Sequence, residues 1–186
     1  MARFIHLNGP PGIGKSTVAS AFADRHAGVL NLDIDQVTTL IGGWSDSFSD
    51  SFGLAIHLAA AMARAHLASG HDVIMPQMMT NVNAAELADF ESAAAAAGAE
   101  YCQLLLTARV ETSVERCTER AKAGDPRQDV ISKVIAENGG RDFLRDLHAQ
   151  VAQFTTGRQP HAVIDCEHLT VEQTRRAIEA ALASGS

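Results

Sequence analysis

The sequence predicts a three-layer α/β/α fold in which helices cover both faces of a five-stranded parallel sheet. Two observations predict it. Short apolar runs alternate along the chain with longer segments of helical periodicity, which is the pattern of repeated βαβ units. The chain has 186 residues, of which 46% are hydrophobic and 20% charged, so it is long enough for one full core and is not disordered. We therefore expect residues 1–186 to form a single domain.

The expected strands and helices follow from these runs. The five apolar runs expected to be strands are Arg3–Asn8, Val29–Leu32, Asp72–Met75, Tyr101–Thr107 and Ala162–Ile164. Helical periodicity is expected over Lys15–His26, Phe52–Ser69, Ala84–Ala97, Thr112–Ala123 and Val171–Ala183. Gly70 and Gly98 stand where helices end, and Thr170 with Gln173 forms a capping box. Residues 125–159 hold one long helix or two shorter ones broken near Gly139-Gly140.

Composition excludes several classes of function. The formal net charge of −7 argues against broad nucleic-acid binding, which needs a basic surface. The cysteines Cys102, Cys117 and Cys166 form no CxxC pair, so neither a disulfide framework nor a structural zinc site is expected. Met1–Leu7 is too short for a signal sequence, and Leu54–Leu67, the longest apolar candidate, is interrupted by charged and His residues. We expect a cytoplasmic protein with no membrane or nucleic-acid partner.

A glycine-rich turn follows the first expected strand and precedes the first expected helix. It matches G-x-x-x-x-G-K-[ST] over Gly9, Pro10, Pro11, Gly12, Ile13, Gly14, Lys15 and Ser16, with Thr17 next. Glycines let the backbone curl so that several N–H groups point at one anion, and the following helix presents its N-terminus to it. Lys15 supplies a charge for the β- and γ-phosphates, and the Ser16 hydroxyl is a Mg²⁺ ligand. The motif predicts binding of a nucleotide such as ATP with Mg²⁺.

Other motifs narrow the class of nucleotide-binding protein. The chain has no [NT]-K-x-D motif, which a GTPase would use to bind its base. The third strand ends in Ile74-Met75-Pro76-Gln77, without the acidic pair expected of a motor or an AAA-type ATPase. A carboxylate pair instead follows the second strand, in Asp33-Ile34-Asp35. Phosphoryl transfer to an acceptor hydroxyl needs such a group to orient or deprotonate it.

These motifs resemble, in type and order, those of the P-loop kinases of small metabolites, a branch that includes shikimate, gluconate and adenylate kinases. They are also similar to chloramphenicol phosphotransferase and the tunicamycin-resistance protein. The matching stretches are Gly9–Ser16, Asp33-x-Asp35, Met75–Met78, Leu104–Leu106 with Glu115-Arg116 and Glu119-Arg120, and Val163–Asp165. The resemblance implies a P-loop NTPase fold with ATP and Mg²⁺, an acceptor-site region at about residues 35–83 and a short lid at about residues 116–140.

The two carboxylates after the second strand are the candidate acid–base and metal groups. Asp35 is the candidate base, because ligands of open α/β sheets bind at the carboxyl ends of the strands. Asp33 would hold Mg²⁺ through a water molecule beside Ser16. Alternatively, one of the two only caps the helix that begins near Gln36. Which of the two is the base stays open.

Three arginines flank the expected lid. Arg116 and Arg120 are four residues apart and share one helix face, which like charges disfavour unless an anion lies between them. The resemblance implies that Arg120 contacts the nucleotide and that Arg127 closes over the transferring phosphate. The alternative is three solvated arginines on a helix and a turn.

The acceptor pocket is less well determined. Trp44, Phe48 and Phe52 either line it beneath the loop Gly42–Gly53 or are buried below that loop. After the third strand, Gln77 and Thr80 are expected to make polar contact with the acceptor. The side chains of Met75, Met78 and Met79 either fill the core or form an adaptable pocket wall.

The sequence therefore predicts an ATP- and Mg²⁺-dependent kinase that phosphorylates a hydroxyl of a small molecule. The alternative is a nucleotide-dependent sensor that transfers no phosphate. A nucleoside-monophosphate kinase would need a second basic site for the phosphate of its acceptor. Arg64 is the only arginine between Arg25 and Arg109, so this function is disfavoured. The acceptor, the choice between ATP and GTP, and the choice between a monomer and a homodimer stay open.

Overall fold

The computed structural model describes residues 1–120 and 126–184, without the side chains of residues 120, 126 and 127. Five parallel strands form one sheet in the order β2-β3-β1-β4-β5. The strands are β1 (Arg3–Asn8), β2 (Leu30–Asn31), β3 (Val73–Met75), β4 (Glu100–Thr107) and β5 (Ala162–Asp165). The central strand β1 pairs Ile5 with Ile74 of β3 and with Cys102 of β4. The five-stranded parallel sheet is as predicted.

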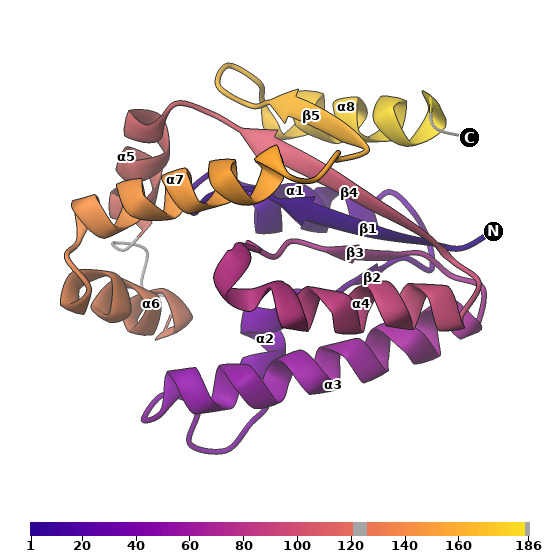
Figure 1. Ribbon diagram of the computed structural model, residues 1–186, viewed down its shortest axis with the longest axis horizontal. Helices are drawn as coiled ribbons and strands as arrows, with labels where there is room; N and C mark the ends of the chain where they lie inside the picture. Colours follow the sequence, from indigo (N-terminus) through magenta and orange to yellow (C-terminus); the bar gives the residue numbers. More distant parts are fainter. Residues whose placement is uncertain (121–125, 185–186) are drawn as a thin grey trace.

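Helices cover both faces of the sheet and make the three layers (Figure 1). On one face, α1 (Lys15–Ala23) packs against α8 (Val171–Ser184) over a core that includes Leu7 and Leu104. The other face is covered by α2 (Ile34–Thr38), α3 (Phe48–Ala68) and α4 (Ala84–Ala96), over a core that includes Phe4 and Phe90. A 3-10 turn, η1 (Asn81–Asn83), precedes α4. Each face of a parallel sheet is thereby shielded from water, as its continuous apolar strands require.

Three further helices follow β4: α5 (Val110–Arg120) and α6 (Pro126–Glu137) lie beyond the carboxyl ends of the strands, and α7 (Arg141–Thr156) runs from there back over the sheet (Figure 1). Gly139 and Gly140 separate α6 from α7 with φ angles of +112° and +64°, which glycine adopts readily. The region after β4 thus contains the two shorter helices that were one of the expected alternatives.

The boundaries differ from expectation mainly around β2 and α3. Strand β2 has only two residues and is an edge strand that pairs with β3 alone. The Ser- and Asp-rich segment expected to be a loop is helical from Phe48 onward, so α3 begins four residues before the expected Phe52. In the described ranges, no helix combines the length and the apolar composition needed to cross a bilayer.

Candidate functional site

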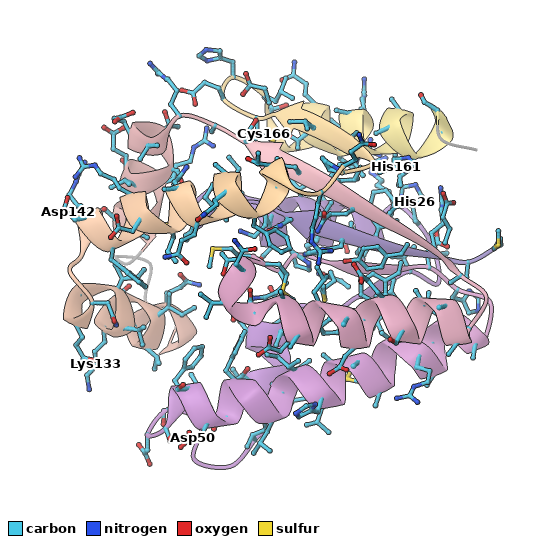
Figure 2. The ribbon with its side chains drawn as sticks, viewed as in Figure 1. His26, Asp50, Lys133, Asp142, His161 and Cys166 are labelled. Carbon is cyan, nitrogen blue, oxygen red and sulfur yellow. The ribbon has the colours of Figure 1, made fainter. Side chains whose placement is uncertain are left out.

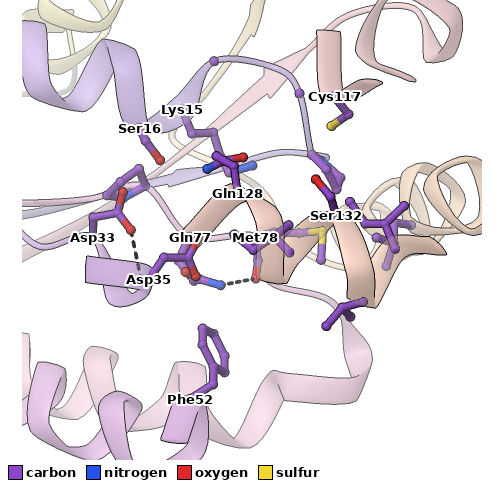
Figure 3. Close-up of a pocket in the computed structure, with 18 of the residues that line it drawn as sticks. Lys15, Ser16, Asp33, Asp35, Phe52, Gln77, Met78, Cys117, Gln128 and Ser132 are labelled. Carbon is purple, nitrogen blue, oxygen red and sulfur yellow. Dashed lines mark hydrogen bonds between the residues drawn. The ribbon is translucent and has the colours of Figure 1, made fainter. Parts of the chain in front are cut away.

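A pocket of about 530 Å³ lies at the carboxyl ends of the strands, next to the glycine-rich turn. It is the place where open parallel sheets bind ligands. Its polar and loop residues are Pro11, Gly12, Gly14, Lys15, Ser16, Thr17, Asp33, Asp35, Gln36, Pro76, Gln77, Cys117, Gln128 and Ser132. The labelled side chains in Figure 3 come from α1, from α2 and its N-cap Asp33, from α3, α5 and α6, and from the segment after β3. The pocket therefore brings the phosphate-binding motif and both candidate carboxylates together.

The glycine-rich turn has the backbone that its glycines allow. Gly9, Gly12 and Gly14 have φ angles of +150°, +79° and +95°. A Cβ on Gly9 would lie 2.5 Å from the Leu106 carbonyl oxygen, and one on Gly12 would collide with the Ser113 carbonyl oxygen. Gly14 has open space around it and is the N-cap of α1. Two of the glycines are thus required by close backbone approach, and all three by conformation.

Lys15 and Ser16 begin α1, at the end where the helix presents its unpaired N–H groups. Lys15 Nζ donates hydrogen bonds to the carbonyl oxygens of Gly9 at 2.8 Å and Pro10 at 2.9 Å, so the ammonium lies across the turn. The Ser113 hydroxyl of α5 donates to the Pro11 carbonyl and joins the turn to α5. The arrangement concentrates positive potential at the pocket floor, which suits a phosphate group.

Asp33 and Asp35 both line the pocket, on the side of α2. Asp33 is the N-cap of α2, and its Oδ1 accepts the Asp35 N–H at 3.0 Å. Asp33 therefore caps α2, and its expected role at Mg²⁺ stays a prediction. A carboxylate has acceptor sites on both oxygens, so capping with Oδ1 does not exclude a second contact. Figure 3 shows the hydrogen bond between Asp33 and Asp35, and Ser16 on the same side of the pocket as Asp33.

A buried histidine below the pocket was not identified from the sequence. His6 of β1 is fully buried, and its Nε2 lies 2.8 Å from the Gln77 carbonyl oxygen. Because a carbonyl only accepts, Nε2 carries the proton, and Nδ1 accepts from the Tyr101 hydroxyl at 2.8 Å. Burial lowers the pKa of His6 to about 4, with a smaller contribution from the Lys15 charge, so the ring is neutral. The signal available in the sequence was the position of His6 between the apolar residues Ile5 and Leu7 of an expected strand.

Asn8 at the end of β1 makes a second link. Its Oδ1 accepts the N–H of Gly9 at 2.8 Å and of Met79 at 2.9 Å, and its Nδ2 donates to the Met79 carbonyl at 3.2 Å. Asn8 is fully buried and pairs the start of the glycine-rich turn with the segment after β3. This side chain holds the two pocket segments in register.

The opposite wall of the pocket is apolar. It consists of Phe48 and Phe52 of α3, Met78, Ile131, Val134 and Ile135 of α6, and Phe143 and Leu147 of α7. The Phe48 and Phe52 rings stack with centroids 5.8 Å apart. Phe48 and Phe52 were expected as one of two alternatives, whereas the contributions of α6 and α7 were missed, because these helices are far from α3 in the sequence.

The other expected residues divide between pocket and core. Gln77 and Met78 line the pocket, while Met75 and Met79 are buried in the core. Trp44 is half-buried and is not among the lining residues. Thr80 is also absent from the lining, since its hydroxyl accepts the Val82 N–H as the N-cap of η1.

The arginines expected in the lid are less fully described. Arg116 donates to the Glu167 carbonyl oxygen at 3.5 Å, so it contacts the β5–α8 connection. The backbone of Arg120 ends α5 and that of Arg127 lies in the first turn of α6, but both side chains fall outside the described part of the chain. Their expected roles therefore stay predictions.

A second group of potential metal ligands lies far from the pocket. Ligand atoms of Glu100, Cys102 and His161 lie within 4.8 Å of one another near the amino ends of β4 and β5. Figure 2 shows His161 on the side of the molecule opposite α6. Burial raises the pKa of Cys102 to about 11, so its thiol stays protonated at neutral pH and is a poor ligand. The pocket instead contains hard oxygen donors of the kind that Mg²⁺ prefers, those of Ser16 and Asp33, whose expected role at the cation stays a prediction.

Comparisons with known proteins agree with this fold. A family model described as an AAA domain matches residues 4–141, which is most of the chain. The tunicamycin resistance protein of Deinococcus radiodurans has a similar structure, with 20% sequence identity, coverage of 98% of this chain and 96% of that chain, and a TM-score of 0.62. A comparison with curated proteins gave no match.

Two solved kinases are also similar in structure. The Mycobacterium tuberculosis APS kinase CysC in complex with AMPPNP and APS has 17% identity, coverage of 98% of both chains and a TM-score of 0.65. The gluconokinase of Sinorhizobium meliloti 1021 has 16% identity, coverage of 98% of this chain and 92% of that chain, and a TM-score of 0.59. At such identities the likeness concerns the fold. The matching family is described as an AAA domain, but β3 lacks the acidic pair expected at its end in an AAA-type ATPase. The carboxylates of the pocket follow β2 instead. The chain belongs to this AAA-domain family, and its fold is similar to that of solved small-molecule kinases.

Proposed function

We propose that this protein is an ATP- and Mg²⁺-dependent kinase that phosphorylates a hydroxyl group of a small molecule. The observation that carries the proposal is the presence of Lys15, Ser16 and Asp35 in one pocket at the carboxyl edge of the sheet. Phosphoryl transfer depends mainly on positioning and on neutralising charge, and these residue types supply both. The kinases among the structural neighbours, one of them solved with AMPPNP, support this choice.

In the proposed reaction the acceptor oxygen forms a bond to the γ-phosphorus, while the bond from that phosphorus to the β–γ bridging oxygen breaks. ADP leaves, and the hydroxyl proton passes to Asp35. The turn amides and Lys15 hold the phosphates at the N-terminus of α1. His6 donates a hydrogen bond to the Gln77 carbonyl and so fixes the segment after β3 at the pocket. Because the ring is neutral, it adds no charge there.

A divalent cation fits the oxygen donors of the pocket. The Ser16 hydroxyl and the Asp33 carboxylate both line it, and both are hard oxygen ligands of the kind that Mg²⁺ prefers. When bound, Mg²⁺ supplies charge neutralisation to the phosphates. The Asp35 N–H donates a hydrogen bond to Asp33 Oδ1 and thereby keeps the Asp33 carboxylate oriented.

The remaining roles are proposals from the motif order. Arg120 contacts the nucleotide, and Arg127 approaches the transferring phosphate as residues 116–140 close as a lid and exclude water. We place the protein in the cytoplasm, where reducing conditions suit Cys102, Cys117 and Cys166, none of which forms a disulfide in the described residues.

The test uses γ-labelled ATP, Mg²⁺ and a panel of sugars, nucleosides and antibiotics, first with the unmodified protein and then with Asp35→Asn. We expect Asp35→Asn to lower the rate of phosphoryl transfer by about 100-fold or more, because no carboxylate is left to take the proton of the substrate hydroxyl. Affinity for AMPPNP, measured by calorimetry, should change little. Asp46→Asn is the matched control, since Asp46 is exposed and outside the pocket lining.

Two outcomes would contradict this proposal. If Asp35→Asn transfers phosphate as fast as the unmodified protein, Asp35 is not the base. If nucleotide binds but no compound in the panel is labelled, the nucleotide-dependent sensor is favoured over the kinase.

A further inference from the structure

The apolar wall of the pocket has a regular construction. Each of three helices contributes two side chains four residues apart: Phe48 and Phe52 from α3, Ile131 and Ile135 from α6, Phe143 and Leu147 from α7. Residues spaced by four share one helix face, so each helix turns an apolar stripe toward the same cavity. All six side chains are only partly buried, although apolar side chains of this size are stabilised by leaving water. The wall is thus suited to an apolar group bound in the cavity.

The charges around the cavity favour an uncharged ligand. Among the described lining residues, Lys15 is the only cation, and its ammonium donates to two carbonyls of the glycine-rich turn. Asp33 and Asp35 place two carboxylates on the same cavity, where they would repel an anionic acceptor.

Two described cations of the surrounding helices pair with carboxylates on their own helices. Lys133 of α6 is exposed and pairs with Glu137 at 4.0 Å, and Arg145 of α7 pairs with Asp142 at 2.7 Å. Figure 2 shows Lys133 and Asp142 at the outer side of these helices. Among the described lining side chains, a carboxylate, sulfate or phosphate on the acceptor would meet only Lys15 as a cation, and burying a charge without a partner is costly.

We infer that the acceptor is an uncharged molecule in which the reacting hydroxyl is attached to an aromatic or aliphatic body. This inference rests on the proposed function, because it assigns the hydroxyl to Asp35 and the apolar body to the wall of α3, α6 and α7. On this inference an anionic metabolite binds less tightly than an uncharged compound of the same shape.

The test uses two matched sets of hydroxyl compounds. The first is phenyl β-glucoside, which is neutral and aromatic, methyl β-glucoside, which lacks the aromatic group, and phenyl β-glucuronide, which adds a carboxylate. The second is methyl 4-(hydroxymethyl)benzoate and the corresponding free acid. Binding is measured by calorimetry with AMPPNP and Mg²⁺, and transfer is measured with γ-labelled ATP. We expect the neutral aromatic member of each set to bind about tenfold or more tightly than its partners.

Variants test whether the wall holds this group. Phe52→Ala and Leu147→Ala should each weaken binding of the neutral aromatic compounds by about fivefold or more, while AMPPNP affinity stays unchanged. Leu54→Ala is the control, because Leu54 lies on α3 but is 57% exposed and outside the lining. Two separate variants keep the test valid if one of them fails to fold.

The outcomes separate this inference from the proposed function. Three results would overturn the inference that the acceptor is uncharged. They are equal or tighter binding of the anionic compounds, binding of neither set of compounds, and a loss of AMPPNP affinity in Phe52→Ala. The last result would mean that the wall holds the nucleobase. Binding of the neutral aromatic compounds without any labelled product would keep the inferred ligand chemistry and overturn the kinase.

Discussion

Single buried polar residues connect parts of this pocket that are distant in the sequence. His6 and Gln77 are 71 positions apart, yet a hydrogen bond of 2.8 Å joins them. Tyr101 completes the network, and burial raises the pKa of its phenol well above the usual value, so the hydroxyl stays a donor to His6. An unpaired polar group in this position would be destabilising, which explains why all three groups have partners.

The neutral state of His6 predicts a pH dependence of stability. The pKa of His6 is about 4 in the folded protein, against 6.5 for a histidine exposed to water in the unfolded chain. The unfolded chain therefore binds the proton first, and the free energy of unfolding falls as the pH drops through this window. Between pH 7 and pH 5 the loss assigned to His6 is about 2 kcal/mol.

Urea unfolding at pH 7 and pH 5 measures this effect, with His6→Gln as the comparison because glutamine keeps hydrogen-bonding groups but does not titrate. The difference between the two pH values should shrink by about 2 kcal/mol in His6→Gln. The same difference in both proteins would show that His6 is not the titrating group.

At the scale of elements, the glycine-rich turn is held between β1, α1 and α5. Gly12 lies against the Ser113 carbonyl oxygen of α5, whereas Gly14 faces open space. Both have positive φ, so a side chain strains the backbone at either position, but only at Gly12 does it also collide with another element.

A pair of alanine substitutions separates these two causes. Gly14→Ala should cost about 1 kcal/mol of unfolding free energy from backbone strain alone. Gly12→Ala should cost more than about 2 kcal/mol, because α5 must also move. Urea denaturation midpoints measure both. Equal losses would show that the approach of α5 to the turn is not tight.

For the whole molecule, the order β2-β3-β1-β4-β5 determines where the pocket forms. From the central β1 the chain passes to the edge strand β2 and then to β3, which lies between β2 and β1. It then crosses to the other side of β1 and forms β4 and β5. The pocket lies at the carboxyl ends of these strands and is covered by α6 and α7. A ligand bound there contacts segments from the first half and the second half of the chain, so its binding stabilises the complete fold.

Nucleotide binding should therefore raise the melting temperature. At a concentration of AMPPNP 100 times its Kd, with Mg²⁺, the stabilisation is about 2.7 kcal/mol, which corresponds to about 5–10 °C for a chain of this length. In Lys15→Ala the shift at the same concentration should be at least halved, because a charge-assisted contact to phosphate is lost. Lys133→Ala, on the outer side of α6, is the control. An unchanged shift in Lys15→Ala would contradict the assigned phosphate contact.

The sequence alone determined the features that depend on local spacing. Glycine positions and the lysine–serine pair indicated the phosphate-binding turn, and the alternation of apolar runs with helical patterns indicated a parallel α/β sheet. Both are encoded by neighbouring residues, because backbone conformation and helix periodicity are local properties. For the same reason, Asp33 and Asp35 were recognised as candidates.

Only the tertiary structure decided how these parts meet. It assigned Asp33 to the cap of α2, brought His6 and Asn8 to the segment after β3, and placed the apolar stripes of α3, α6 and α7 around one cavity. Helix periodicity shows which face of each helix is apolar, but not which other face it will oppose. That choice depends on strand order and on chain crossovers, which bring distant residues together through packing.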